Sequence, residues 1–157
     1  MCNIEYLNFK KVDPKDLMAV LNENSLRAHL IHHPYFDITS IQAWIKDKTE
    51  TDAMWGCRVR VVSIDGSLAG WCGVQPDDNG FEIAIVISQR FWGSGIPIFK
   101  NLMNWARGLG HKEVRCHLLD SRREYKALVT MATKVYHTQL LGRCFTTYHF
   151  AVDQQNA

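Results

Sequence analysis

Several signals that would fix the class of this 157-residue chain at once are missing from it. No stretch approaches the roughly 18 uninterrupted apolar residues of a membrane-spanning helix, so no membrane segment is expected. The N-terminus has no basic segment followed by an apolar run, so a secretory signal is not expected either. Lys and Arg exceed Asp and Glu by only 18 to 16. That excess is too small to indicate a nucleic-acid partner.

The cysteines do not form the spacings that bind zinc or support redox chemistry. There are five, an odd number, and none belongs to a Cys-x-x-Cys pair. We interpret Cys57, Cys72, Cys116 and Cys144, which lie in apolar or strand-like runs, as small buried residues of a reducing compartment. The sequence therefore predicts a cytoplasmic protein without a structural metal.

What is present is the composition of a globular protein, with 46% apolar and 22% charged residues. The length suits a single domain over residues 1–157. The small net charge hides a division: residues 47–82 carry three Lys or Arg and seven Asp or Glu, whereas residues 100–126 carry seven and three. The first segment would attract a cation or an amine and the second an anion. The alternative is that both are solvated faces without a partner.

The hydrophobic pattern changes period several times along the chain. In the first half it predicts a strand at 3–9, a helix from Asp13-Pro14 to about 22 and a helix capped by Thr39-x-x-Gln42. Strands at 57–62, 68–74 and 81–87 follow, with a hairpin at Asp65-Gly66. The remainder is predicted as a helix ending near 109, a strand at 113–118, a helix from Ser121-x-x-Glu124 to Tyr136, and one or two strands within 139–152. The order β-α-α-β-β-β-α-β-α-β(β) predicts an α/β fold with a mixed, mostly antiparallel central sheet flanked by helices.

The segment from Ile87 to Pro97 is the most informative. A strand leads into it, a helix leads out, and Gly93 and Gly95 lie at the junction. A helix N-terminus with free N–H groups is a ready site for an anion such as a phosphate. The segment is neither a Walker A loop nor a dinucleotide fingerprint, because Ile98 stands where the third glycine would be. On the glycines alone, a plain strand-to-helix turn is the favoured interpretation.

The wider context adds a resemblance. Phe-Trp-Gly-Ser-Gly-Ile, preceded by the strand Phe-Glu-Ile-Ala-Ile-Val-Ile, resembles the GNAT superfamily of N-acetyltransferases, and most closely its ribosomal-protein-alanine acetyltransferase branch. The resemblance implies that the turn binds the pyrophosphate of acetyl-CoA through backbone N–H groups and that pantetheine pairs with the preceding strand. The residues it assigns to the cofactor are Val86, Ile87, Trp92, Gly93, Ser94, Gly95, Ile96 and Ser121.

The match to the family's Arg/Gln-x-x-Gly-x-Gly/Ala motif can be aligned in two registers. We place Trp92 at its first position because Trp-Gly-x-Gly-Ile then aligns as a unit, and the alternative register begins at Arg90. Pro97 occupies a position that is small in the family. This departure removes one N–H donor to the phosphates.

The resemblance also implies two catalytic roles. Acetyl transfer needs a neutral amine, and Glu82, the carboxylate of the strand at 81–87, resembles the family's general base. A solvent-facing carboxylate is the alternative reading. The acid that protonates the departing thiolate would be Tyr136, near the end of the predicted helix, with Tyr125 as the other candidate. Ser121 replaces the family's Asn at the start of this helix, and the usual Gly-Phe after it is missing.

These observations predict an enzyme that moves acetyl from acetyl-CoA to a primary amine of a small molecule or protein, acting as a monomer or homodimer without a metal. Histidines at 29, 32 and 33, with Tyr35 and Phe36, would line the acceptor pocket rather than bind a metal. Two alternatives remain. One is a non-catalytic acyl-CoA-binding module of the same fold, and the other is an acetyltransferase acting on aminoacyl-tRNA through the basic segment 100–126.

Overall fold

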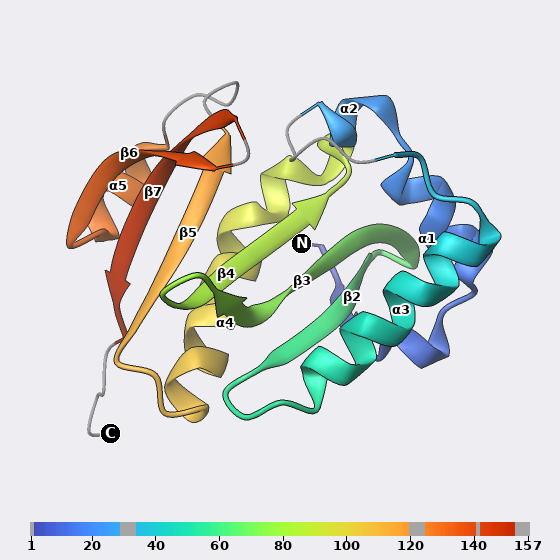
Figure 1. Cartoon of the computed structure of the whole chain (residues 1–157), viewed down its shortest axis with the longest axis horizontal. Coiled ribbons are helices and arrows are strands. Elements are labelled where there is room, and N and C mark those ends of the chain that lie inside the picture. Colours follow the sequence, from blue (N-terminus) through green and yellow to red (C-terminus); the bar gives the residue numbers. More distant parts are fainter. Residues whose placement is uncertain (1, 29–33, 120–124, 141, 153–157) are drawn as a thin grey trace.

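A single seven-stranded sheet forms the centre of the computed structural model, which describes residues 2–28, 34–119, 125–140 and 142–152 (Figure 1). The strands are β1 (Ile4–Leu7), β2 (Arg58–Ile64), β3 (Ser67–Asp77), β4 (Gly80–Ile87), β5 (Glu113–Leu119), β6 (Lys134–Leu140) and β7 (Arg143–Ala151). They lie in the order β1-β2-β3-β4-β5-β7-β6, and all neighbours are antiparallel except β4 and β5. The predicted mixed, mostly antiparallel α/β fold is confirmed.

Helices cover both faces of the sheet. They are α1 (Pro14–Leu21), α2 (Asn24–Arg27), α3 (Ile38–Asp52), α4 (Gly95–Gly108) and α5 (Lys126–Met131), with 3-10 turns η1 (Phe9–Lys11) and η2 (Gln89–Ser94). The core consists of two clusters, one on each face of the sheet. Val59, Val61 and Trp71 pack with α1 and α3 on one face, whereas Cys72 and Ile83 pack with α4 on the other. None of these helices, within the described residues, is long and apolar enough to cross a membrane.

Two local signals fold as predicted. Asp13 caps α1 by accepting from the Lys15 N–H at 2.9 Å, and Pro14 is the first helical residue. Asp65 and Gly66 both have positive φ, 51° and 82°, and join β2 to β3 in a tight hairpin. The meander of β2, β3 and β4 that follows from this turn is confirmed.

The capping box of α3 differs from the predicted one. Asp37, rather than Thr39, precedes the first turn and accepts from the Ser40 N–H at 2.7 Å. The Ser40 hydroxyl in turn accepts from the Asp37 N–H at 2.9 Å. The prediction was wrong by two residues because an Asp–Ser pair satisfies the same free N–H groups as Thr–Gln. The strand predicted at 3–9 also ends earlier, because Phe9 turns inward in η1.

The predicted helix extending to Tyr136 is wrong. Helix α5 ends at Met131, and residues from Lys134 onward form β6. Val135, Tyr136 and Thr138 are β-branched or aromatic residues, and their partnership with β7 outweighs the weak helical spacing. The proposed Ser121-x-x-Glu124 cap lies outside the described residues.

Three of the four cysteines expected in the core are there, namely Cys57, Cys72 and Cys116. Cys144 is exposed, so its predicted burial was wrong. It lies at the start of β7, next to the hairpin with β6, where it pairs with Gln139. All the described cysteines are free thiols.

Candidate active site

The two parallel strands in the middle of the sheet separate. Within the described residues, β4 and β5 share one Cα pair, Glu82 with Arg115, and then diverge (Figure 1). A cavity of about 1430 Å³ follows the opening, lined on one side by β4 from Glu82 to Ile87 and on the other by β5 from Arg115 to Leu118. This is larger than the volume of a typical small-ligand pocket, roughly 300–1,000 Å³.

The edge of β4 that faces β5 directs backbone groups into this gap, and one of them, the Ile87 carbonyl, accepts from Trp92. The Ser88 N–H bonds to the Ala69 carbonyl at 2.8 Å, so alternate residues of β4 bond to β3. Ile85 and Ile87 are the residues between, and their backbone groups face β5. Val86 directs its backbone toward β3 and lines the cavity with its side chain. Ile85, which the sequence analysis did not select, therefore has the position that strand-like pairing with a ligand requires.

The turn after β4 leaves open space. Neither Gly93 nor Gly95 has positive φ, and a Cβ added to either would meet nothing within 4 Å. The backbone does not need glycine here, so the two residues leave a space that a ligand could fill. Trp92, Gly95 and Ile96 line the cavity, whereas Ser94 is buried. The Trp92 indole N–H donates to the Ile87 carbonyl at 3.2 Å and so closes the turn.

Few N–H groups of the first turn of α4 remain available to a ligand. The Gly95 N–H bonds to the Trp92 carbonyl, and Pro97, the third helical residue, has no N–H. The Ile98 N–H closes the first helical turn on the Ser94 carbonyl, so the amide of Ile96 is the donor that the first three helical residues can give to an anion. The open space in front of it has room for a phosphate group, but with fewer donors than a full set of free amides would supply.

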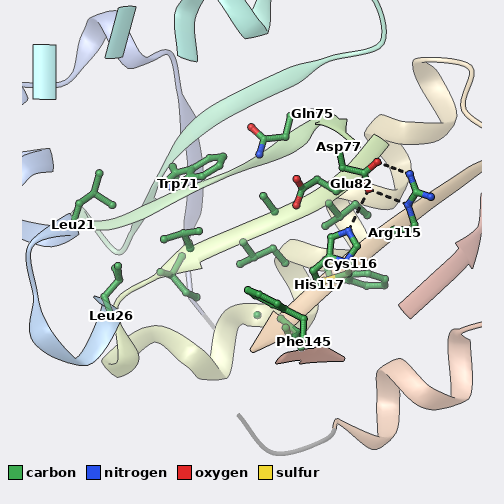
Figure 2. Close-up of a pocket in the computed structure, with 18 of the residues that line it drawn as sticks. Leu21, Leu26, Trp71, Gln75, Asp77, Glu82, Arg115, Cys116, His117 and Phe145 are labelled. Carbon is green, nitrogen blue, oxygen red and sulfur yellow. Dashed lines mark hydrogen bonds and ion pairs between the residues drawn. The ribbon is translucent and has the colours of Figure 1, made fainter. Parts of the chain in front are cut away.

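Glu82 lies on the face of β4 that it shares with Ala84 and Val86, opposite Ile83 (Figure 2). Burial, and next the negative charge of Asp77, raise the pKa of Glu82 to about 7. A hydrogen bond from Gln75 and the positive charges of Lys48 and Arg115 oppose this rise. A carboxyl with a pKa near neutrality can accept a proton at physiological pH and release it again.

A lysine on α3 binds Gln75, the residue that donates a hydrogen bond to Glu82. The Lys48 Nζ donates to Gln75 Oε1 at 2.8 Å and lies 4.2 Å from the centre of the Trp71 ring. Because Gln75 uses its oxygen for Lys48, its amide nitrogen is the atom that donates to Glu82. Burial lowers the pKa of Lys48. Sequence reasoning missed both supporting residues, although Gln75 is the residue directly opposite Glu82 in the hairpin of β3 and β4.

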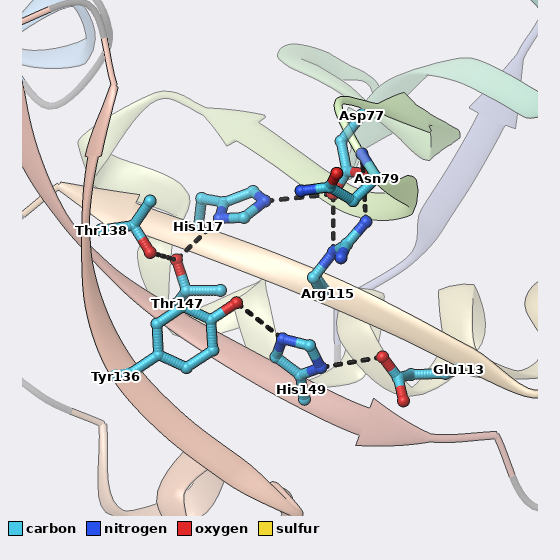
Figure 3. A network of polar contacts seen from close by, with 9 residues as sticks. All are labelled: Asp77, Asn79, Glu113, Arg115, His117, Tyr136, Thr138, Thr147 and His149. Atoms are coloured by element: carbon cyan, nitrogen blue, oxygen red, sulfur yellow. Dashed lines mark hydrogen bonds and ion pairs between the residues drawn. The ribbon is translucent and has the colours of Figure 1, made fainter.

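Beside Glu82, a set of charged and polar side chains is centred on Asp77 (Figure 3). Arg115 donates to both carboxylate oxygens of Asp77, with Nε at 2.9 Å from Oδ2. His117 Nε2 lies 3.2 Å from the same Oδ2, and the Asn79 N–H donates to Oδ1. Burial would raise the pKa of Asp77, but these hydrogen bonds, first that of Arg115, outweigh it and lower the pKa.

Two chains of hydrogen bonds cross β5, β7 and β6 on this face (Figure 3). In the first, His117 Nδ1 lies 2.8 Å from Thr147 Oγ1, which lies 2.8 Å from Thr138 Oγ1. In the second, the Tyr136 hydroxyl lies 2.8 Å from His149 Nε2, and His149 Nδ1 lies 2.8 Å from Glu113 Oε1. The strand registers place both chains on the same side of the sheet as Glu82.

Tyr136 thus lines the cavity from a strand rather than from a helix end, and its role as the thiolate acid stays a prediction. Tyr125, the other candidate, lines the cavity next to α5. Ser121 and the three histidines at 29, 32 and 33 lie outside the described residues. Tyr35 and Phe36 do line the cavity. No group of three potential metal ligands occurs in the described part of the chain.

Comparison with known proteins gives matches among solved structures alone. No family model matches the chain, and neither does any curated protein. A probable GNAT-family acetyltransferase from Chromobacterium violaceum has 15% identity and a TM-score of 0.68, covering 99% of this chain and 90% of that one. A presumed acetyltransferase from Salmonella typhimurium, solved with its cofactor acetyl-CoA, has 14% identity and a TM-score of 0.64, covering 100% and 97%.

An N-acetyltransferase from Staphylococcus aureus Mu50 is similar over a comparable length. It has 13% identity and a TM-score of 0.67, and the alignment covers 98% of this chain and 99% of that one. At such identities the likeness establishes the architecture. The chain has the fold of the GNAT acetyltransferases.

Proposed function

We propose that the protein transfers an acetyl group from acetyl-CoA to a primary amine of a small molecule or protein. The observation that carries this proposal is Glu82, a carboxyl with a pKa of about 7 at the point where β4 and β5 part. The amine nitrogen would attack the thioester carbonyl, the C–S bond would break, and Glu82 would accept the amine proton directly or through water. No covalent enzyme intermediate is required.

The cofactor would occupy the gap and the open turn. The Ile96 amide, next to the open space at Gly93 and Gly95, would donate to a pyrophosphate, and the edge of β4 at Ile85 and the Ile87 N–H suits the amides of pantetheine. The similar structure that was solved with acetyl-CoA supports this choice of donor. The proposed cofactor site also includes Trp92, Gly93, Ser94, Gly95 and Ser121. The resemblance of the turn to the ribosomal-protein-alanine acetyltransferase branch stays a prediction.

A second candidate is an acyl-CoA-binding module without transferase activity. The reduced set of N–H donors at α4 favours it, since Gly95 bonds to Trp92 and Pro97 has no N–H. An aminoacyl-tRNA substrate fits less well. The described residues that line the cavity include Asp37, Asp77, Asp78 and Glu82 but a single guanidinium, and this charge would repel a phosphate backbone.

Two measurements test the proposal. Calorimetric titration with acetyl-CoA should show binding, and absence of heat at millimolar cofactor would refute both candidates. Release of free CoA in the presence of a panel of primary amines then separates them. The enzyme should turn over at least one amine, whereas the binding module would bind CoA and acetylate none.

A further inference from the structure

The polar end of the cavity, where β5, β7 and β6 form the floor, is not explained by acetyl transfer itself. We infer that this end, lined by Tyr136 and Thr138, is a subsite for a second cationic nitrogen of the acceptor, so that the acceptor is a flexible diamine. The inference rests on the proposed function for the identity of the first nitrogen, the one that Glu82 would deprotonate. The subsite itself is argued from hydrogen-bond direction, charge and spacing.

The first chain of hydrogen bonds has a direction. The Asp77 carboxylate can only accept, so His117 Nε2 must donate to it. With the imidazole neutral, Nδ1 is then an acceptor, and the Thr147 hydroxyl donates its proton to it. Thr147 is fully buried and accepts in turn from the Thr138 hydroxyl. The proton of Thr138 is thereby directed into the protein.

The second chain has the same direction. Glu113 accepts from His149 Nδ1, so the neutral imidazole presents Nε2 as an acceptor. The Tyr136 hydroxyl donates to that nitrogen at 2.8 Å. Its proton is therefore also directed into the floor, away from the cavity.

Both hydroxyls are left with lone pairs, not protons, for a ligand. Each hydroxyl has one proton and two acceptor sites, so Tyr136 and Thr138 face the cavity as hydrogen-bond acceptors. A ligand at this end must supply N–H or O–H donors. A carboxylate or phosphate has none when ionised and would leave the two hydroxyl oxygens unmatched.

Charge selects among such donors. The cavity lining in the described residues includes four carboxylates, from Asp37, Asp77, Asp78 and Glu82, against the single guanidinium of Arg115. Arg115 is itself committed to Asp77. The remaining negative charge favours an ammonium over a neutral hydroxyl compound. The donor that fits acceptor oxygens in a negative cavity is a protonated amine.

The spacing suits one molecule bound at both ends. The Tyr136 and Thr138 hydroxyls reach partners on β7, which is two strands from β4 in the sheet. At the register of Glu82, where β4 and β5 are still paired, neighbouring strands lie about 4.8 Å apart, so these hydroxyls are roughly 10 Å from Glu82. After about 3 Å of contact distance at each end, about 4 Å remains between the two nitrogens, and a diamine with two or three methylene groups spans it.

Direct binding tests the subsite without requiring turnover. Calorimetry at pH 8 would compare 1,3-diaminopropane, 1-aminopropane and 3-aminopropanoate, which differ in the group at the far end. We expect the diamine to bind about tenfold more tightly than the monoamine, and 3-aminopropanoate to bind more weakly than either. Tyr136→Phe and Thr138→Val should each reduce the preference for the diamine. Thr130→Val, on the exposed side of α5, is the matched control and should leave it unchanged.

Equal binding of diamine and monoamine would overturn the inference, as would absence of binding by all three compounds. Tighter binding of 3-aminopropanoate would also overturn it, because the two hydroxyls would then be donating to the ligand. Failure of the proposed function looks different. Diamine preference without any acetylation would refute catalysis and keep the subsite, whereas acetylation of 1-aminopropane at the same kcat/KM as the diamine would refute the subsite alone.

Discussion

Glu82 on β4 and Arg115 on β5 are Cα partners at the point where two parallel strands begin to separate. The pairing brings the candidate base to the start of the cavity, and it also brings the base near an ion pair, because Arg115 is held by Asp77. Glu82 is therefore half-buried between a negative and a positive neighbour. Its raised pKa shows that burial and the charge of Asp77 prevail.

Replacing Glu82 by Gln should stabilise the fold at alkaline pH. The carboxyl has a pKa of about 7 when folded and an ordinary value near 4.5 otherwise, so its ionisation opposes folding as pH rises through that window. The variant should equal the wild type below about pH 4.5 and exceed it above pH 7, by up to about 3 kcal/mol. Thermal unfolding across pH 4–9 measures this. A variant less stable than the wild type at pH 8 would contradict the pKa.

The same variant should lose activity with a defined pH signature. Wild-type kcat/KM should fall as pH drops below about 7, because Glu82 becomes protonated. Glu82→Gln should lower kcat by about 100-fold or more and abolish this limb of the profile. Glu50→Gln, an exposed carboxylate on α3, provides the matched control. Normal turnover by Glu82→Gln would remove it as the base.

Lys48 should act on Glu82 without touching substrate. Its ammonium fixes Gln75 through a 2.8 Å hydrogen bond, and its charge favours the ionised form of Glu82. Lys48→Met should therefore raise the pKa of Glu82 and move the acidic limb of the kcat profile to higher pH. Lys46→Met, an exposed change on the same helix, should leave the profile in place. An unmoved limb in Lys48→Met would show that Lys48 contributes packing alone.

The open turn gives a prediction that separates binding from folding. Gly95→Ala should weaken acetyl-CoA binding, because the new methyl group enters space that no protein atom occupies within 4 Å. Stability should stay equal or rise slightly, since Ala is about 1 kcal/mol better than Gly inside a helix. Gly108→Ala, at the other end of α4, also meets open space and should leave cofactor binding unchanged. Unaltered affinity in Gly95→Ala would place the phosphates elsewhere.

The sequence predicts those parts of the fold that local chemistry determines. The Asp65-Gly66 hairpin and the orientation of Glu82 both follow from alternation along single strands. What could not be predicted depends on pairing between distant segments. Gln75 reaches Glu82 through the register of β3 and β4, and Lys48, on a helix packed on the sheet, reaches Gln75 from 27 residues away in the sequence. Tyr136 was misplaced because its element is set by β7, not by its own helical spacing.

Tyr136 distinguishes two roles in one experiment. A thiolate acid would lower kcat for every acceptor when it is replaced by Phe, whereas a subsite residue would raise KM for diamines and spare 1-aminopropane. The phenol oxygen lies 2.8 Å from His149 Nε2, to which it donates its proton, and this favours the second outcome, with kcat for 1-aminopropane within about twofold of wild type. Tyr125→Phe, which also lines the cavity, should be measured in parallel. A general loss of kcat confined to Tyr136→Phe would assign the acid to Tyr136, and the same loss confined to Tyr125→Phe would assign it to Tyr125.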